Sequence, residues 1–128
     1  MNEDLVREFN SWTDRMMLEH DGIAASAHSF NLYEHVDSLA VQLMGAAKYD
    51  PDDPSWACDE RFSSGEDLFD IPRALVGDDW RRGLDAAKSL VSGYLQIGTQ
   101  AARMRLSRAV AVGFVDGDLE LVHVREDA

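Results

Sequence analysis

Apolar residues recur every three or four positions along residues 3–19, which is the period of one face of an α-helix. These positions are Leu5, Phe9, Trp12, Met16 and Leu18. Charged residues, among them Arg7 and Arg15, occupy positions between them. A helix with this pattern buries one stripe and exposes the opposite face. We therefore predict an amphipathic helix over residues 3–19 that ends near Gly22.

Residues 31–49 show a second pattern of helical spacing. Its apolar members are Leu32, Val36, Leu39, Ala40, Leu43 and Ala47. Ser29 or Asn31 offers a side-chain oxygen that can bind the unpaired amides of a first helical turn. The two prolines that follow the pattern disfavour helical geometry in the residues before them. We therefore predict a second helix over residues 31–49, with a start nearer Ala24 as the alternative.

The segment from residue 50 to residue 77 lacks a sustained pattern. Residues 56–58 are consistent with a short strand, and residues 67–72 with an extended or single-turn piece that carries apolar side chains. A connection of this length is longer than a compact domain usually needs. Long loops of this kind tend to have a function of their own.

The longest helix is predicted from residue 80 to about residue 103, with Asp78 or Asp79 as its N-cap. Its apolar side chains are Trp80, Leu84, Ala87, Val91, Tyr94, Leu95 and Ala102. Gly93 and Gly98 inside it each weaken a helix by about 1 kcal/mol relative to alanine. They mark either close packing or an earlier end near Ile97.

The C-terminal sequence predicts a β-hairpin. Two runs rich in β-branched residues, 109–115 and 119–124, flank Asp116-Gly117, and such a pair between alternating apolar residues is a strong hairpin signal. With these two residues as the loop, one face has larger side chains than the other. The larger face has Val110, Val112, Phe114, Leu119, Leu121 and His123. We expect helices to pack closely on the smaller face and the hairpin to be buried on both sides.

A hairpin alone is only marginally stable, so it needs a third strand. That strand could come from the residues near Trp56 or from a second copy of the chain, which would make a homo-oligomer through the hairpin edge. The length fits one domain over residues 1–128. The predicted fold class is therefore α+β, with about three helices packed on a C-terminal antiparallel β-hairpin and a third short strand as an option. The expected core includes Trp12, Leu39, Leu43, Leu84, Val91, Val112 and Phe114.

Negative charge is concentrated in residues 50–79, called the acidic segment below. It holds ten acidic residues and two arginines, so it supplies −8 of the chain's formal charge of −12. A concentrated negative surface speeds the encounter with a positively charged partner. We therefore interpret the segment as a docking surface for a basic protein, and a solvated loop that keeps the protein soluble is the alternative.

The predicted partner-binding residues combine carboxylates with aromatic anchors. The carboxylates are Asp52, Asp53, Asp59, Glu60, Glu66, Asp67 and Asp70, and the aromatic residues are Trp56, Phe62 and Phe69. At interfaces a few desolvated side chains supply most of the binding energy, while rim charges mainly set the association rate. A competing hypothesis is that Arg103, Arg105 and Arg108 neutralise the acidic segment within the same molecule.

No residues with diagnostic catalytic or metal-binding spacing are present. His28, Glu34 and His35 supply too few converging ligands for a zinc site. Cys58 has no neighbour in the sequence that would activate its thiol. We therefore expect no catalytic residue, no metal and no cofactor.

The acidic balance argues against binding to nucleic acid or to an anionic membrane, since both are polyanions. The single cysteine, Cys58, forms no internal disulfide and points to a reducing compartment. The first residues have neither a basic start nor an apolar run, so we expect no signal peptide, and no segment has the length of a membrane span. The expected location is the cytoplasm.

Three segments, residues 56–62, 66–72 and 112–120, together resemble bacterial immunity proteins of polymorphic toxin systems. These are small acidic cytosolic proteins encoded beside secreted or contact-delivered toxins. The resemblance implies tight binding to one cognate toxin, occlusion of its active site and no enzymatic activity. Toxins that act on nucleic acids or nucleotides have basic clefts, which an acidic loop fits. Because immunity proteins differ from one toxin to the next, the resemblance assigns no individual binding residue.

Two other function classes stay open. One is a small acidic regulatory or adaptor module without a toxin partner, for which a dimer through the hairpin is an option. The other is an enzyme, for which a cleft that contains Cys58 or His35 would argue.

Overall fold

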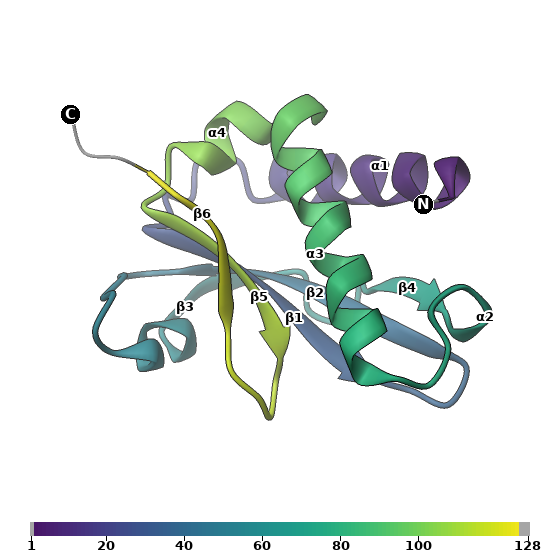
Figure 1. Cartoon of the computed structure of the whole chain (residues 1–128). Helices are drawn as coiled ribbons and strands as arrows, with labels where there is room; N and C mark the ends of the chain where they lie inside the picture. Colours follow the sequence, from purple (N-terminus) through teal and green to yellow (C-terminus); the bar gives the residue numbers. More distant parts are fainter. Residues whose placement is uncertain (1, 126–128) are drawn as a thin grey trace.

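A computed structural model of the chain describes residues 2–125, which form a mixed β-sheet with helices on it (Figure 1). The helices are α1 (Glu3–Glu19), α2 (Arg73–Val76), α3 (Trp80–Ile97) and α4 (Ala101–Arg105), with a 3₁₀ helix η1 (Pro54–Cys58). The strands are β1 (Ala27–Glu34), β2 (Ser38–Ala46), β3 (Glu60–Ser63), β4 (Phe69–Pro72), β5 (Ala109–Phe114) and β6 (Glu120–Val124).

The structure is α+β, but the predicted arrangement of about three helices on a C-terminal hairpin is wrong. The described residues contain four α-helices and a six-stranded sheet of order β3-β2-β1-β5-β6, in which β4 also pairs with β2. β5 and β6 do form an antiparallel hairpin. The strand beside it is β1, which runs parallel to β5. Neither the residues near Trp56 nor a second copy of the chain therefore supplies the third strand.

The helix predicted over residues 31–49 is wrong, because this stretch forms most of the β1–β2 hairpin. Both strands lie in the middle of the sheet and are covered on both faces, so apolar residues occur on both sides of each strand. A nearly continuous apolar run matches helical spacing as well as it matches a buried strand. Val36, assigned to the apolar stripe of that helix, lies in the turn and is 94% exposed.

The other two helices begin where the sequence pattern predicts. The Asn2 side chain accepts hydrogen bonds from two amides of the first turn of α1. The Asp79 side chain caps α3 by accepting a hydrogen bond from the amide of Arg81 at 2.9 Å. α3 ends at Ile97, the earlier of the two ends considered, and α4 follows after a short break.

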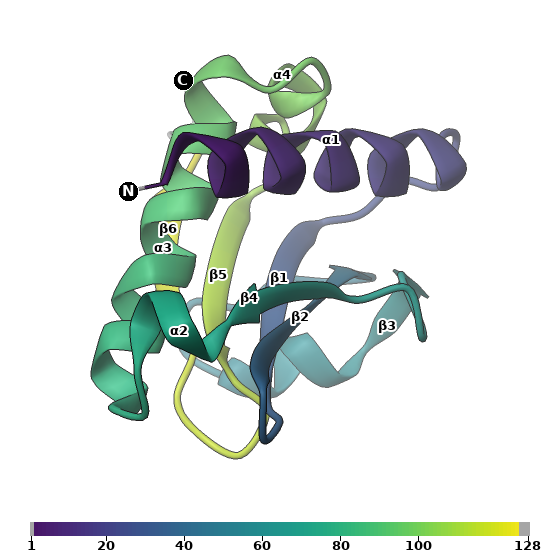
Figure 2. The same cartoon turned by 90° about the vertical axis from the view of Figure 1, so that its right-hand side faces the viewer.

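The main core lies between the sheet and α1, α3 and α4, which share one side of the sheet (Figure 2). Six of the seven predicted core residues are buried: Trp12, Leu39, Leu43, Leu84, Val91 and Val112. The seventh, Phe114, is half-buried. The helices pack on the face of β5 that carries Val110 and Val112, which is the face with the larger side chains. The expectation that helices press on the smaller face is therefore wrong.

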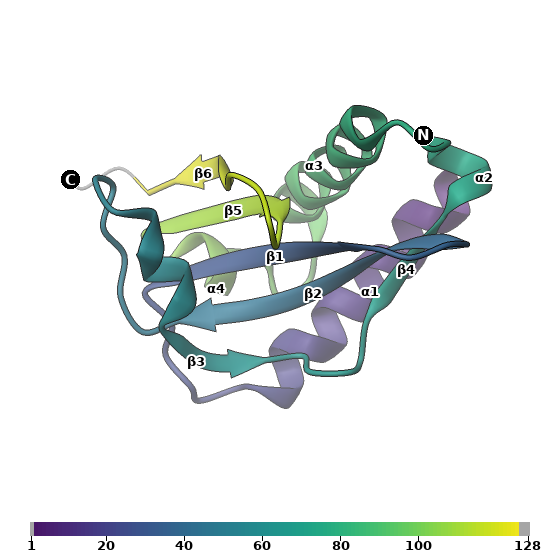
Figure 3. The same ribbon diagram turned by 90° about the horizontal axis from the view of Figure 1, so that it is seen from below.

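The opposite face of the sheet is covered by η1, which is visible when the molecule is seen from below (Figure 3). The indole of Trp56 is the large member of this second cluster. It packs with Ala27, Met44, Ala46, Ala109 and Ala111. The small side chains on the central strands leave room for this one indole ring. Residues 56–58, predicted as a short strand, belong to the 3₁₀ helix that places the ring there.

The β5–β6 hairpin also differs in detail from its prediction. Residues 115–119 connect the strands, in place of a two-residue loop at Asp116-Gly117. The register shifts between Val110 and Ala111, so Leu121 pairs with Ala111. β5 is buried on both faces, whereas β6 is an edge strand with several exposed side chains.

Candidate functional site

The acidic segment runs from the end of β2 through η1, β3, β4 and α2. Most of its predicted partner-binding carboxylates are exposed. They are Asp52, Asp53, Asp59, Glu60, Glu66 and Asp70, while Asp67 is partly buried. The segment therefore presents its negative charge to solvent, as a docking surface requires.

The three aromatic residues predicted as anchors lie in the core instead. Trp56, Phe62 and Phe69 are 4%, 7% and 8% exposed. Phe69 packs edge-on against Phe9, with ring centroids 5.2 Å apart. Phe62 stacks on the ring of His20 at 4.6 Å. Aromatic side chains that complete the fold are not free to insert into a partner, so none of the three is an accessible anchor in this structure.

The acidic segment is not neutralised by the three arginines that precede β5. Arg103 binds the Asp21 carboxylate and the carbonyl of Met17. Arg105 donates to the carbonyl of Leu95. Arg108 donates to the carbonyl of Tyr49 and lies over its ring. Within residues 2–125 none of the three forms an ion pair with a carboxylate of the acidic segment.

Only two of the predicted carboxylates form ion pairs with described residues. Asp67 pairs with Arg15 at 2.5 Å, and Asp59 lies 3.9 Å from Lys48. The Arg15 hydrogen bond is the main reason that the pKa of Asp67 lies below its ordinary value. Asp53 caps η1 by accepting a hydrogen bond from Ser55, which lowers the pKa of Asp53. The remaining carboxylates keep their charge available to a partner.

A second acidic surface surrounds the exposed indole of Trp80, and sequence reasoning did not find it. A cavity of about 550 Å³ lies between the start of α3 and the β5–β6 connection. Its carboxylates are Glu34, Asp78, Asp116, Asp118 and Glu120. Trp80, which is 49% exposed, forms its aromatic wall with Phe114, the two ring centroids lying 6.4 Å apart. We call this feature the Trp80 cavity.

The Trp80 cavity has more negative charge than its own cations offset. Glu34 lies 3.7 Å from Arg73, and Glu120 pairs with Lys88 at 2.9 Å. Its three aspartates have no ion pair within residues 2–125. The guanidinium of Arg81 lies over the Trp80 ring, 5.0 Å from its centroid. Carboxylates beside an aromatic face attract cations, so the cavity suits an arginine or lysine side chain.

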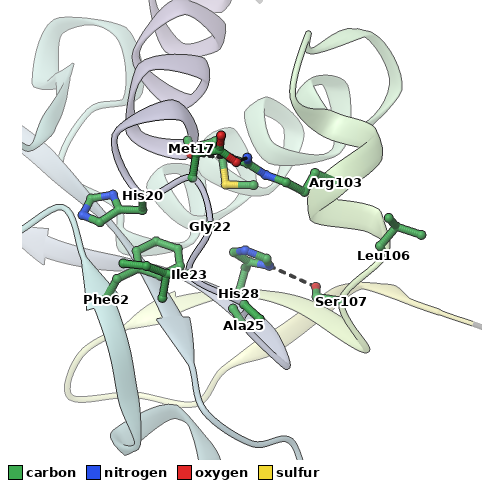
Figure 4. A pocket seen from close by; sticks show the side chains of 12 residues that line it. Met17, His20, Gly22, Ile23, Ala25, His28, Phe62, Arg103, Leu106 and Ser107 are labelled. Carbon is green, nitrogen blue, oxygen red and sulfur yellow. Dashed lines mark hydrogen bonds and ion pairs between the residues drawn. The ribbon is translucent and has the colours of Figure 1, made fainter.

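A smaller cavity of about 380 Å³ lies where α1, β1 and α4 meet. Figure 4 shows His28 near its centre, with Phe62 on one side and Ser107 on the other. His28 is 4% exposed, and its Nδ1 lies 3.0 Å from Ser107 Oγ. Burial, together with the nearby charge of Arg103, lowers the pKa of His28 to about 4. The imidazole is therefore neutral at neutral pH.

The other groups considered for chemistry are scattered. His35 lies in the turn after β1, away from the strand position of His28. Within residues 2–125 no three His, Cys, Asp or Glu side chains are grouped so as to hold a metal ion. Cys58 is exposed, and the small cavity that it borders with Asn31 has no histidine in its lining. The absence of a catalytic or metal centre remains a prediction.

None of the helices in the described part of the chain is both long and apolar enough to cross a membrane. No protein-family model matches the chain, and neither does any of the curated proteins or solved structures compared with it.

Proposed function

We propose that this protein is a non-catalytic immunity protein that binds a bacterial toxin with a basic cleft and blocks the toxin's active site. The supporting observation is the excess of unpaired carboxylates in the acidic segment and around the Trp80 cavity. Carboxylates that are exposed and not paired internally act on a partner before contact, which raises the association rate. The proposed partner is therefore a protein with a positive surface.

In this proposal the partner is anchored at the Trp80 cavity, because the aromatic residues of the acidic segment are buried. Half-exposed tryptophans beside charged groups are frequent centres of binding energy in protein interfaces. In the proposed complex an arginine or lysine of the toxin enters this cavity, and the acidic segment contributes long-range attraction. We place the complex in the cytoplasm, where Cys58 stays reduced. Nucleic acid and membranes are not proposed as ligands, since both are polyanions.

The matching experiment identifies a toxin gene beside the gene of this chain, co-expresses the two proteins and measures cell growth and the association rate of the purified pair. The double variant Asp116→Asn, Asp118→Asn should slow association and weaken its dependence on salt. A matched control, Glu3→Gln with Glu8→Gln, removes the same charge from exposed positions of α1 and should change the rate much less. If both double variants slow association equally, only the total charge matters, and this would contradict a specific role of the Trp80 cavity. Failure of the chain to rescue growth would refute the immunity function.

A dimeric regulatory or adaptor module is the second candidate. The observation in its favour is that β6 is an edge strand with Leu121 and Val124 about half exposed. Exposed edge strands can pair with the same strand of another copy. Sedimentation would distinguish the two candidates, because the adaptor function requires a dimer in the absence of any toxin.

A further inference from the structure

The cavity around His28 contains a ring nitrogen that has no hydrogen-bond partner in the described part of the chain. His28 lies on β1, on the side of the sheet that faces the helices, and its neighbours on this side are the core residues Phe30 and Leu32. One ring nitrogen, Nδ1, lies 3.0 Å from Ser107 Oγ. The other, Nε2, has no hydrogen bond to any group in residues 2–125 and is accessible from the cavity, although the residue as a whole is only 4% exposed. A ring nitrogen that faces a cavity without a protein partner can accept a hydrogen bond from a ligand there.

The hydrogen bonds around Ser107 determine which nitrogen of His28 carries the proton. Ser107 has one hydroxyl proton, and its Oγ lies 2.7 Å from the carbonyl oxygen of Met104. A carbonyl can only accept, so the hydroxyl donates to Met104 and its oxygen accepts from His28 Nδ1–H. Nε2 is then unprotonated and offers a lone pair. In Figure 4 the edge of the His28 ring away from Ser107 faces the interior of the cavity.

The remaining lining makes the cavity a site for an uncharged ligand. Arg103 is the cation on its rim, and that guanidinium is already engaged by the Asp21 carboxylate and the Met17 carbonyl. An anion would therefore gain little from Arg103, whose charge is already offset by Asp21, and the lone pair of His28 Nε2 would repel it. A cation would lose its hydration without gaining an unpaired carboxylate, because Asp21 is already paired with Arg103. A neutral molecule with an N–H or O–H group avoids both penalties and satisfies His28.

The side chains that line the cavity favour a flat, apolar ligand. Apolar side chains from α1, from β3 and from the segments that follow α1 and α4 line it: Met17, Ile23, Ala25, Phe62 and Leu106. The stacked rings of Phe62 and His20 add an aromatic wall. Sites of this size with apolar walls and a single directed polar group are typical of small-molecule pockets.

We propose that this cavity binds a small uncharged aromatic molecule that donates one hydrogen bond to His28 Nε2. The site shares Phe62 with the acidic segment but none of its carboxylates, and the inference does not rest on the proposed immunity function. Indole is a suitable probe because it is flat, neutral and has one N–H donor. Benzofuran has nearly the same shape and lacks that donor, so the pair isolates the hydrogen bond.

The test is titration of the whole protein with each probe, followed by the ¹⁵N resonances of the His28 ring. Indole should bind with a dissociation constant in the range of about 1 mM or below and at least about fivefold more tightly than benzofuran. Indole should also shift the Nε2 resonance, while benzofuran leaves it unchanged. Equal binding of the two probes would overturn the role of His28 as acceptor. No binding of indole up to about 10 mM would overturn the site itself.

A variant pair confirms the location without disturbing the core. Leu106 lines the cavity and is 66% exposed, so Leu106→Trp should fill the cavity and leave the fold intact. Ile97 is 71% exposed and lies outside the lining, which makes Ile97→Trp the matched control. We expect Leu106→Trp to abolish indole binding and Ile97→Trp to preserve it. Binding that survives in Leu106→Trp would place the ligand elsewhere and refute the proposal.

Discussion

Arg15 of α1 and Asp67 of the acidic segment form an ion pair although they lie 52 residues apart in the chain. The indole N–H of Trp12 donates a further hydrogen bond to the same carboxylate at 3.2 Å. Asp67 therefore ties α1 to the segment that leads into β4. Its neighbour Glu66 is exposed and has no hydrogen bond or ion pair to a described side chain. The two adjacent carboxylates therefore differ in their contacts with the rest of the fold.

Asp67→Asn should lower the free energy of unfolding by up to about 1 kcal/mol, since the pair is solvent-exposed and its energy is screened. Glu66→Gln should leave stability unchanged and slow association with a basic partner. Urea denaturation and association kinetics on both variants measure the two effects. A stability loss of the same size in Glu66→Gln would show that Glu66 too is part of an internal charge network.

The Asp67 effect should depend on pH in a defined direction. The pKa of Asp67 is lower in the folded protein than its ordinary value. The ion pair therefore stabilises the fold above the ordinary pKa of an aspartate, and this contribution disappears as the pH falls through the folded value. The difference in stability between wild type and Asp67→Asn should shrink accordingly in acid.

Phe69→Ala should act on folding rather than on partner release. Phe69 packs against Phe9 and Trp12 in the main core, so its truncation should cost about 3–5 kcal/mol. Trp80→Ala removes a half-exposed ring and should cost much less stability, while it speeds dissociation of the partner. Thermal denaturation and dissociation rates separate the two variants. Faster dissociation in a stable Phe69→Ala protein would contradict the burial of this ring.

The sequence was most informative where one face of an element meets solvent. α1 and α3 each have a polar side, so the apolar stripe defines a helix and its limits. β1 and β2 have no such side, because Trp56 covers one face and α1 the other. Residues 31–49 therefore contain no alternation that would separate a strand from a helix. The parallel pairing of β1 with β5 depends on contacts distant in sequence, which no local pattern encodes.

For the candidate site, charge was predictable and geometry was not. The excess of carboxylates in the acidic segment follows from composition alone. Whether Trp56, Phe62 or Phe69 is exposed depends on which strands lie opposite, so their anchoring role could not be judged from local sequence. Trp80 has the spacing of a core residue on α3, yet it lies in the first turn, beyond the edge of the packed interior.

Tyr94 and Asp14 join α3 to α1 through a hydrogen bond of 2.6 Å. Burial and the Asp14 carboxylate raise the pKa of Tyr94, so its hydroxyl stays a donor. Tyr94→Phe should lower the free energy of unfolding by about 2 kcal/mol, because the lost bond reaches a charged acceptor. Tyr33→Phe is the matched control, since the Tyr33 hydroxyl bonds only the neutral Gln42 amide at 3.1 Å. An equal loss in both variants would contradict the charged character of the Tyr94 bond.

Acid should destabilise this protein through His28. In the unfolded chain this histidine takes up a proton near its ordinary pKa of 6.5, whereas in the folded protein it does so only at about 4. Between these values the unfolded state binds more protons, so stability falls as the pH drops. The fall should reach about 2 kcal/mol between about pH 7 and 5, and about 3 kcal/mol once the folded pKa is passed.

The readout is the slope of unfolding free energy against pH, measured by urea denaturation. His28→Asn keeps an amide near Nδ1 that can donate to Ser107, and it removes the titrating group. This variant should be less stable at neutral pH because the smaller side chain leaves space, yet its stability should change far less down to about pH 5. His35→Gln, at an exposed turn position, should retain the wild-type slope. A wild-type slope in His28→Asn would mean that the acid sensitivity arises from other groups, and that the buried imidazole does not resist protonation.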